Sequence, residues 1–184
     1  MNGLVAVGVP LALVIRLTSI VATLMLVRHA RACRWMAIGG SIVASVMTAV
    51  VAMHVIGSAS AIDGTLFRHA ASETELGYSV TPLSAWFLMV LALIAVPVAL
   101  YSAGYFAHAL ARPRTAAVGA AFNAMVGGLE VVFVADSVIG FLCGWEVMTL
   151  ATAALVATEH ESRASRHGVD PHGGLLSFTP SRRY

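Results

Sequence analysis

Five apolar runs, each long enough to cross a lipid bilayer, constrain this chain more than any other feature of its sequence. An α-helix rises about 1.5 Å per residue, so about 20 apolar residues span the roughly 30 Å hydrocarbon core. Apolar residues make up 59% of the chain and charged residues 11%, whereas a globular domain is about 25% charged. We therefore expect an all-α integral membrane protein with five transmembrane helices. The runs cover about residues 4–27, 36–57, 83–106, 116–136 and 138–158.

The predicted organisation is a transmembrane helical domain over residues 1–158 and a tail over residues 159–184. The tail is rich in Gly, Ser, Arg, His and Pro and has no apolar period, so disorder is expected there. The two cysteines, Cys33 and Cys143, belong to no CxxC or Cys/His spacing. We therefore predict no disulfide, no metal site and no iron–sulfur cluster.

The arginines are segregated between loops, which predicts an orientation in the membrane. Arg28, Arg31 and Arg34 crowd the first loop, and Arg112 and Arg114 follow the third apolar run. By the positive-inside rule both loops are cytoplasmic, so the N-terminus is expected outside and the tail in the cytoplasm. The expected location is the cell inner (plasma) membrane, as a multi-pass protein. Arginines spread in this way form no nucleic-acid patch, and no nucleic-acid partner is expected.

Residues 58–82 are polar enough to leave the membrane. They carry three acids and one arginine, a net charge of minus two, which suits an extracytoplasmic loop. Residues 65–67 and 76–80 are predicted to pair as a short hairpin-like structure, although no Asn-Gly type of turn separates them.

Glu146 stands inside an otherwise lipid-compatible run, residues 140–161. An acid at the centre of a membrane helix costs about 2.5 to 3.5 kcal/mol, so an ionisable residue there indicates a function. Arg16 lies near the middle of the first run. It either has a structural role, by snorkelling or by packing against a partner protein, or takes a direct part in charge movement. Arg16 is therefore a possible charge partner for an intramembrane acid.

Glu130 is the second intramembrane acid. Asn123, Gly127 and Glu130 follow one another at steps of four and three residues and so share one helix face. Counted from the short turn between the fourth and fifth runs, Glu130 and Glu146 lie at similar depths. Either the two acids face each other, an arrangement that favours proton exchange, or each acid separately caps a partner helix or pairs with Arg16. Both acids are candidates for proton transfer.

Two segments carry a resemblance to a known family: TPLSAWFLMVLALIAVPVALYSAGYF (residues 81–106) and FLCGWEVMTLATAALVATEHE (residues 141–161). They resemble the proton-pumping, Mrp antiporter-like membrane subunits of respiratory complex I. The closest resemblance is to the large membrane subunit of formate hydrogenlyase and hydrogenase-4 type complexes. The resemblance implies that Glu146 matches the fifth-helix glutamate, which takes part in proton translocation by pairing with a lysine on a later helix.

The resemblance also implies which partners the chain has and which subunits of the complex carry out electron transfer. Other membrane subunits of a hydrogenase or dehydrogenase complex are the expected partners, together with the lipid bilayer. Electron transfer belongs to those subunits, so this chain is expected to bind no cofactor and to perform no redox chemistry, whatever oxidoreductase complex it joins.

The chain departs from the family pattern in three ways. It contains no lysine, it has Thr81 where an acid often precedes Pro-Leu-Ser, and the family's lysine and broken helices belong to a part that would follow Glu161. We therefore expect an N-terminal portion of such a subunit, arising from gene fragmentation or completed by a second polypeptide. Two further interpretations are a component of an Mrp-type cation/proton antiporter and a truncated, non-pumping membrane scaffold.

Overall fold

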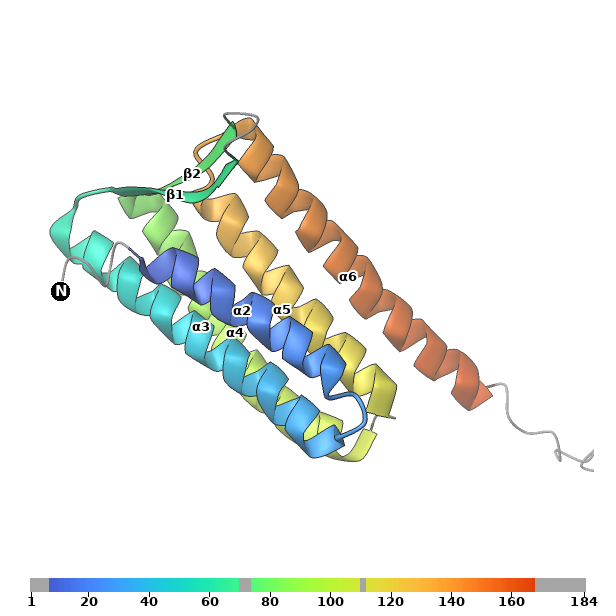
Figure 1. Cartoon of the computed structure of the whole chain (residues 1–184). Helices are drawn as coiled ribbons and strands as arrows, with labels where there is room; N and C mark the ends of the chain where they lie inside the picture. Colours follow the sequence, from blue (N-terminus) through green and yellow to red (C-terminus); the bar gives the residue numbers. More distant parts are fainter. Residues whose placement is uncertain (1–6, 70–73, 110–111, 168–184) are drawn as a thin grey trace, which may run out of the picture.

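The structure is a computed structural model that describes residues 7–69, 74–109 and 112–167 (Figure 1). It is mostly helical, and five of its helices are long and apolar enough to cross a membrane. The prediction of a mostly helical chain with five candidate membrane spans is therefore confirmed for the described residues. The elements, in chain order, are α2 (Gly8–Met25), α3 (Ala30–Ser58), β1 (Ile62–His69), β2 (Thr74–Val80), α4 (Pro82–Ala109), α5 (Arg112–Val134) and α6 (Val138–His167).

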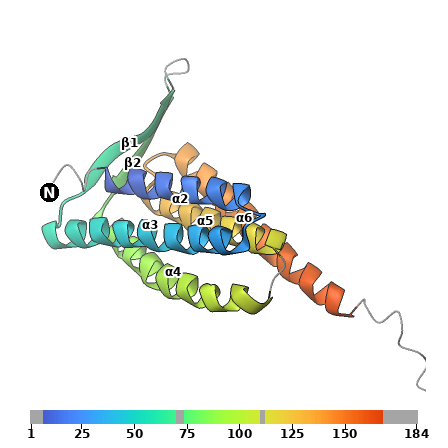
Figure 2. The same cartoon turned by 60° about the horizontal axis from the view of Figure 1, so that its bottom comes forward.

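Four helices form a bundle, and the fifth lies against one side of it. α3 packs against α2, α4 and α5, and α5 also packs against α2. α6 packs against α5 and touches β2, so it runs along the outside of the bundle (Figures 1 and 2). The C-terminal ends of α2 and α4 and the N-terminal ends of α3 and α5 lie at one end, which we call the arginine end because Arg28, Arg31 and Arg34 lie there.

The strands lie across the other end, which we call the hairpin end. β1 and β2 pair antiparallel from Ile62 with Val80 to His69 with Thr74, with an irregularity between Thr65 and Phe67. The predicted pairing of residues 65–67 with 76–80 is therefore present, within longer strands. Its extracytoplasmic placement stays a prediction.

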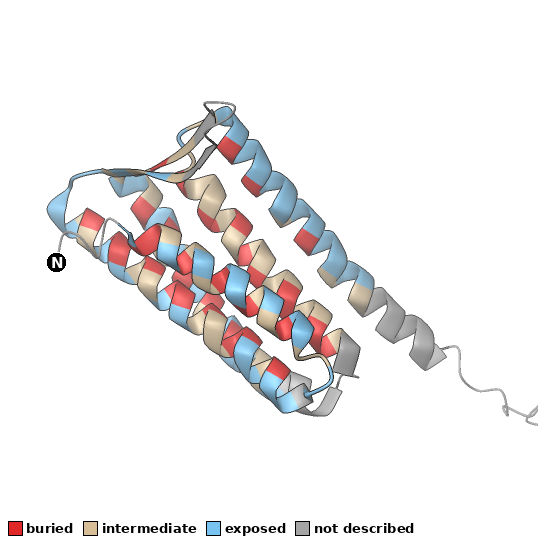
Figure 3. Cartoon of the chain, in the orientation of Figure 1, coloured by how far each residue is buried: buried red, intermediate tan, exposed pale blue. Residues whose placement is uncertain are grey.

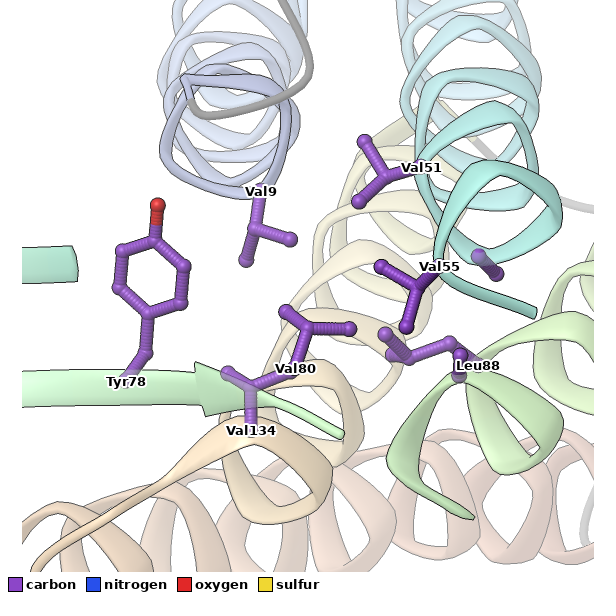
Figure 4. Close-up of a cluster of buried hydrophobic side chains, with 9 residues drawn as sticks. Val9, Val51, Val55, Tyr78, Val80, Leu88 and Val134 are labelled. Carbon is purple, nitrogen blue, oxygen red and sulfur yellow. The ribbon is translucent and has the colours of Figure 1, made fainter. Parts of the chain in front are cut away.

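A cluster of buried apolar side chains fills the interior at the hairpin end (Figure 4). It draws on the four bundle helices and on β2, so it fastens the hairpin to the bundle. We call it the apolar cluster. Its members are Val9, Val51, Ala52, Val55, Tyr78, Val80, Ala85, Leu88 and Val134.

The outward surface of the helices is apolar, as a bilayer requires. α6 is exposed along most of its length (Figure 3), and large side chains such as Leu142, Trp145 and Leu150 are about half exposed or more. In water such an apolar surface would promote aggregation, whereas lipid tails solvate it.

Two helix ends differ in how the sequence determines them. α4 begins at Pro82, a residue suited to a first helical position, and Thr81 Oγ1 accepts a hydrogen bond from the Ser84 backbone N–H at 3.1 Å. α6 continues to His167, beyond the predicted end at residue 158. Between Gly144 and Gly168 the sequence contains no Gly or Pro that would stop the helix. The rest of the predicted tail lies outside the described residues.

Candidate functional site: an ion pair buried inside the bundle

Arg16 and Glu130 form a two-point ion pair in the interior of the bundle. Arg16 Nε donates to Glu130 Oε2 at 2.7 Å, and Arg16 Nη2 donates to Glu130 Oε1 at 2.8 Å. The side chains are 1% and 2% exposed. The pair joins α2 to α5. This parallel geometry is the strongest arrangement that an arginine and a carboxylate can adopt.

Hydroxyl groups of α3 complete the coordination of both charges. Arg16 Nη2 donates to Ser45 Oγ at 2.9 Å, and Arg16 Nη1 lies 3.5 Å from Ser41 Oγ. Thr48 Oγ1 donates to Glu130 Oε1 at 2.8 Å, with the Ala44 carbonyl as an alternative acceptor at 3.0 Å. Both charges are thus hydrogen-bonded as well as paired, which is the condition for burying them.

The spacing of small residues makes room for the arginine. Gly127 precedes Glu130 by one helical turn, and a Cβ there would come 3.3 Å from Arg16 Cδ. Asn123, one turn earlier still, is 1% exposed and donates to the carbonyls of Ala37 and Gly119 at 2.9 and 3.1 Å. The polar face predicted for this helix is therefore turned inward.

Glu146 lies on the exposed face of α6. It shares that face with Cys143, Thr149 and Ala153, which are also exposed. Within the described ranges its carboxylate has neither an ion-pair partner nor a hydrogen bond. The structure therefore brings Arg16 to Glu130 and not to Glu146.

The two acids are at similar depth but do not face each other. A Cβ at Gly128 would lie 2.9 Å from the Gly144 carbonyl oxygen and from the Met148 amide nitrogen, so the segments around Glu130 and Glu146 run side by side. Glu130 nevertheless points into the bundle, and Glu146 is exposed.

A groove of about 260 Å³ opens between α2, α5 and α6, beside the ion pair. Arg16 and Asn123 contribute to its walls together with apolar residues and glycines. Its other lining residues are Leu13, Leu17, Ile20, Ala124, Gly127, Gly128, Val131, Cys143, Gly144 and Val147. Among the residues that the structure describes, no three potential metal ligands come together.

Sequence reasoning missed the hydroxyl groups that hold the pair. Ser41, Ser45 and Thr48 follow one another at steps of four and three residues. This spacing places three hydroxyls on one face of α3. This spacing was the sequence feature that could have predicted the three hydroxyls around the pair.

Comparison with known proteins finds a family that is similar to one part of the chain. Residues 67–114 match the family described as the N-terminus of chain 5 of NADH-ubiquinone oxidoreductase (complex I). These residues include the whole of β2 and α4, and they contain none of Arg16, Glu130 and Glu146. No curated protein matches the chain. The chain is thus mostly helical in the part that the structure describes, with five candidate membrane spans, and its residues 67–114 are similar to the N-terminus of complex I chain 5.

Proposed function

We propose that this chain is the N-terminal part of a membrane subunit of a proton-translocating complex related to hydrogenases or NADH-quinone oxidoreductases, and that Glu146 takes part in its proton transfer. The observation that carries the proposal is the exposed carboxylate of Glu146 on an apolar membrane face of α6. The match of residues 67–114 to complex I chain 5 supports the kind of complex.

An ionised carboxylate facing lipid is unfavourable. Translocon measurements put the cost of a charge at the helix centre at about 2.5 to 3.5 kcal/mol. Glu146 must therefore carry a proton or meet a cation that lies outside the described residues, because the described residues supply no cation to it. A carboxylate that changes between these two states gains and loses a proton as its partner approaches or leaves. We propose this exchange as its part in translocation.

Glu130 is the second proposed proton-transfer residue, with a different constraint. Its two oxygens accept from Arg16 and Thr48, so adding a proton would leave the Arg16 charge unpaired inside the bundle. Glu130 would therefore exchange a proton only when Arg16 moves away or when another negative charge pairs with Arg16 in place of Glu130. Glu146 has no such constraint and is the better candidate for the exchange.

Replacement of Glu146 by Gln in the assembled complex tests the proposal. Glu146→Gln should abolish proton translocation, because glutamine keeps the size of the side chain but cannot change charge. The measurement is dye-reported acidification of membrane vesicles during turnover, with electron transfer followed in parallel. Thr149→Val, on the same exposed face, is the matched control and should translocate normally. Unchanged translocation in Glu146→Gln would contradict the proposal.

A further inference from the structure

Three arginines lie close together where α2 ends and α3 begins. Arg28 belongs to the link between Met25 and Ala30, and Arg31 and Arg34 belong to the first two turns of α3. Arg28 and Arg31 are exposed, and Arg34 is partly buried. None of the three forms an ion pair with another described residue. We call these three arginines the basic patch.

The acids that the structure describes all lie away from the basic patch. Asp63 and Asp136 lie at the hairpin end, Glu130 is paired with Arg16 inside the bundle, and Glu146 lies on α6 within a candidate membrane span. The positive charge of the basic patch is therefore not neutralised by any described side chain, and it attracts anions.

The basic patch lies at the boundary of two candidate membrane spans. One span is Gly8–Met25 and the next is Arg31–Ser58, so Arg28 lies between them and Arg31 is the first residue of the second. Lipid phosphate groups lie at this same boundary between hydrocarbon and water. A guanidinium group can bind phosphate oxygens through two parallel hydrogen bonds. The patch is thus at the depth at which it can bind headgroups.

Exposed apolar side chains border the basic patch on its membrane side. Leu24 and Met25, at the end of α2, are 51% and 79% exposed, and Trp35 on α3 is 62% exposed. Tryptophan is enriched at membrane–water interfaces. Cationic and apolar side chains that lie next to each other match a molecule with an anionic head and an apolar tail, whereas the acidic surface of a soluble protein would leave the apolar part uncovered.

We propose that the basic patch binds the headgroup phosphates of anionic phospholipids in preference to zwitterionic ones. A zwitterionic headgroup also carries a phosphate, but its ammonium group repels the arginines, so the net charge of the lipid decides. The preference belongs to the arginine end, because at the hairpin end Arg68 stands opposite Glu75 in the strand register and Asp63 is exposed. It does not depend on the function proposed above for Glu146.

Two exposed tryptophans report on the lipids at the two ends of the molecule. Trp35 lies beside the basic patch, and Trp86, which is 59% exposed, lies near the start of α4 at the hairpin end. Trp86→Phe with Trp145→Phe leaves Trp35 as the reporter, and Trp35→Phe with Trp145→Phe leaves Trp86. Each 184-residue chain is placed in phosphatidylcholine bilayers with brominated phosphatidylglycerol or brominated phosphatidylcholine. Bromine quenches the fluorescence of a tryptophan that the lipid contacts, so the two lipids can be compared at each end.

Trp35 should show a preference for phosphatidylglycerol of about five-fold or more, the factor that one arginine near an anionic surface contributes. Trp86 should show a preference near one. Because exposed charges are screened by salt, 1 M NaCl should lower the preference at Trp35. Arg28→Gln with Arg31→Gln should bring it close to one, while Arg68→Gln, which removes the same charge at the hairpin end, should leave it unchanged.

Equal quenching of Trp35 by the two lipids would overturn the proposal, and so would the same preference at Trp35 and Trp86. A preference that survives in Arg28→Gln with Arg31→Gln would also overturn it. Should that variant fail to fold, the salt dependence in the chain that keeps Trp35 and all its arginines decides, and a preference that 1 M NaCl leaves unchanged would contradict binding through charge.

Discussion

Arg16 is the largest fully buried side chain in the part of the chain that the structure describes. Its charge is tolerated because Glu130 neutralises it and Ser45 accepts a further hydrogen bond. Isolated in a membrane helix, the same arginine would be costly wherever it could not reach water. The stability of α2 in its observed position therefore depends on an acid that lies more than 100 residues away along the chain.

A double-mutant cycle on this pair should show strong coupling. Arg16→Met alone or Glu130→Gln alone should each lower stability by about 3 to 5 kcal/mol, because the remaining group stays buried without its partner. The double variant should recover much of the loss, since neither charge remains. Thermal unfolding in detergent or bilayers measures all four proteins. Additive losses would show that the two residues act independently.

At the scale of the elements, α6 depends on one close contact between backbones. Gly128 on α5 and Gly144 on α6 each leave space that the backbone of the other helix occupies. Small residues permit such approach between membrane helices, where packing rather than the hydrophobic effect drives association. α6 makes most of its contacts with α5, so this contact determines where Glu146 points.

Gly128→Val should therefore destabilise the docking of α6. The new Cβ would meet the Gly144 carbonyl oxygen at 2.9 Å, and backbone cannot move aside as a side chain can. We expect a loss of about 1 to 3 kcal/mol, measured by thermal unfolding. Gly39→Val is the matched control, because it makes the same change inside α3, where nothing lies within 4 Å. Equal effects of the two variants would refute the role of the contact.

At the scale of the whole molecule, the hairpin and the bundle are joined through Tyr78. Tyr78 is 2% exposed and belongs to the apolar cluster, and it also forms a bridge with Ala135 after α5. Burial, and secondly the negative charge of Asp63, raise the pKa of the Tyr78 phenol. The folded protein therefore holds this proton more tightly than the unfolded chain does.

This pKa shift predicts a loss of stability at alkaline pH. An ordinary tyrosine has a pKa of about 10. Because the folded pKa of Tyr78 is raised, its contribution is complete below pH about 10 and is lost as the pH rises through the folded pKa. Spectrophotometric titration of tyrosinate should show one late-titrating group that disappears in Tyr78→Phe. Titration of Tyr78 at or below the ordinary value would contradict this prediction.

Much of the fold followed from local pattern. The apolar runs predicted five helices, because length and hydropathy alone decide which segments can cross a bilayer. The steps of three and four residues placed Asn123 and Glu130 on one face, because the helical period is a property of the backbone. The helix limits were less accurate: α6 runs to His167 rather than ending at residue 158.

The sequence by itself therefore determined the helices, the polar face of α5 and the pairing of the hairpin. The tertiary structure alone decided that Arg16 pairs with Glu130, that three serine and threonine hydroxyls of α3 lie around the pair, and that Glu146 is exposed. The physical reason is that the helical period relates residues of one helix only. The rotation of one helix against the next is decided by close contacts between helices, such as that between Gly128 and Gly144.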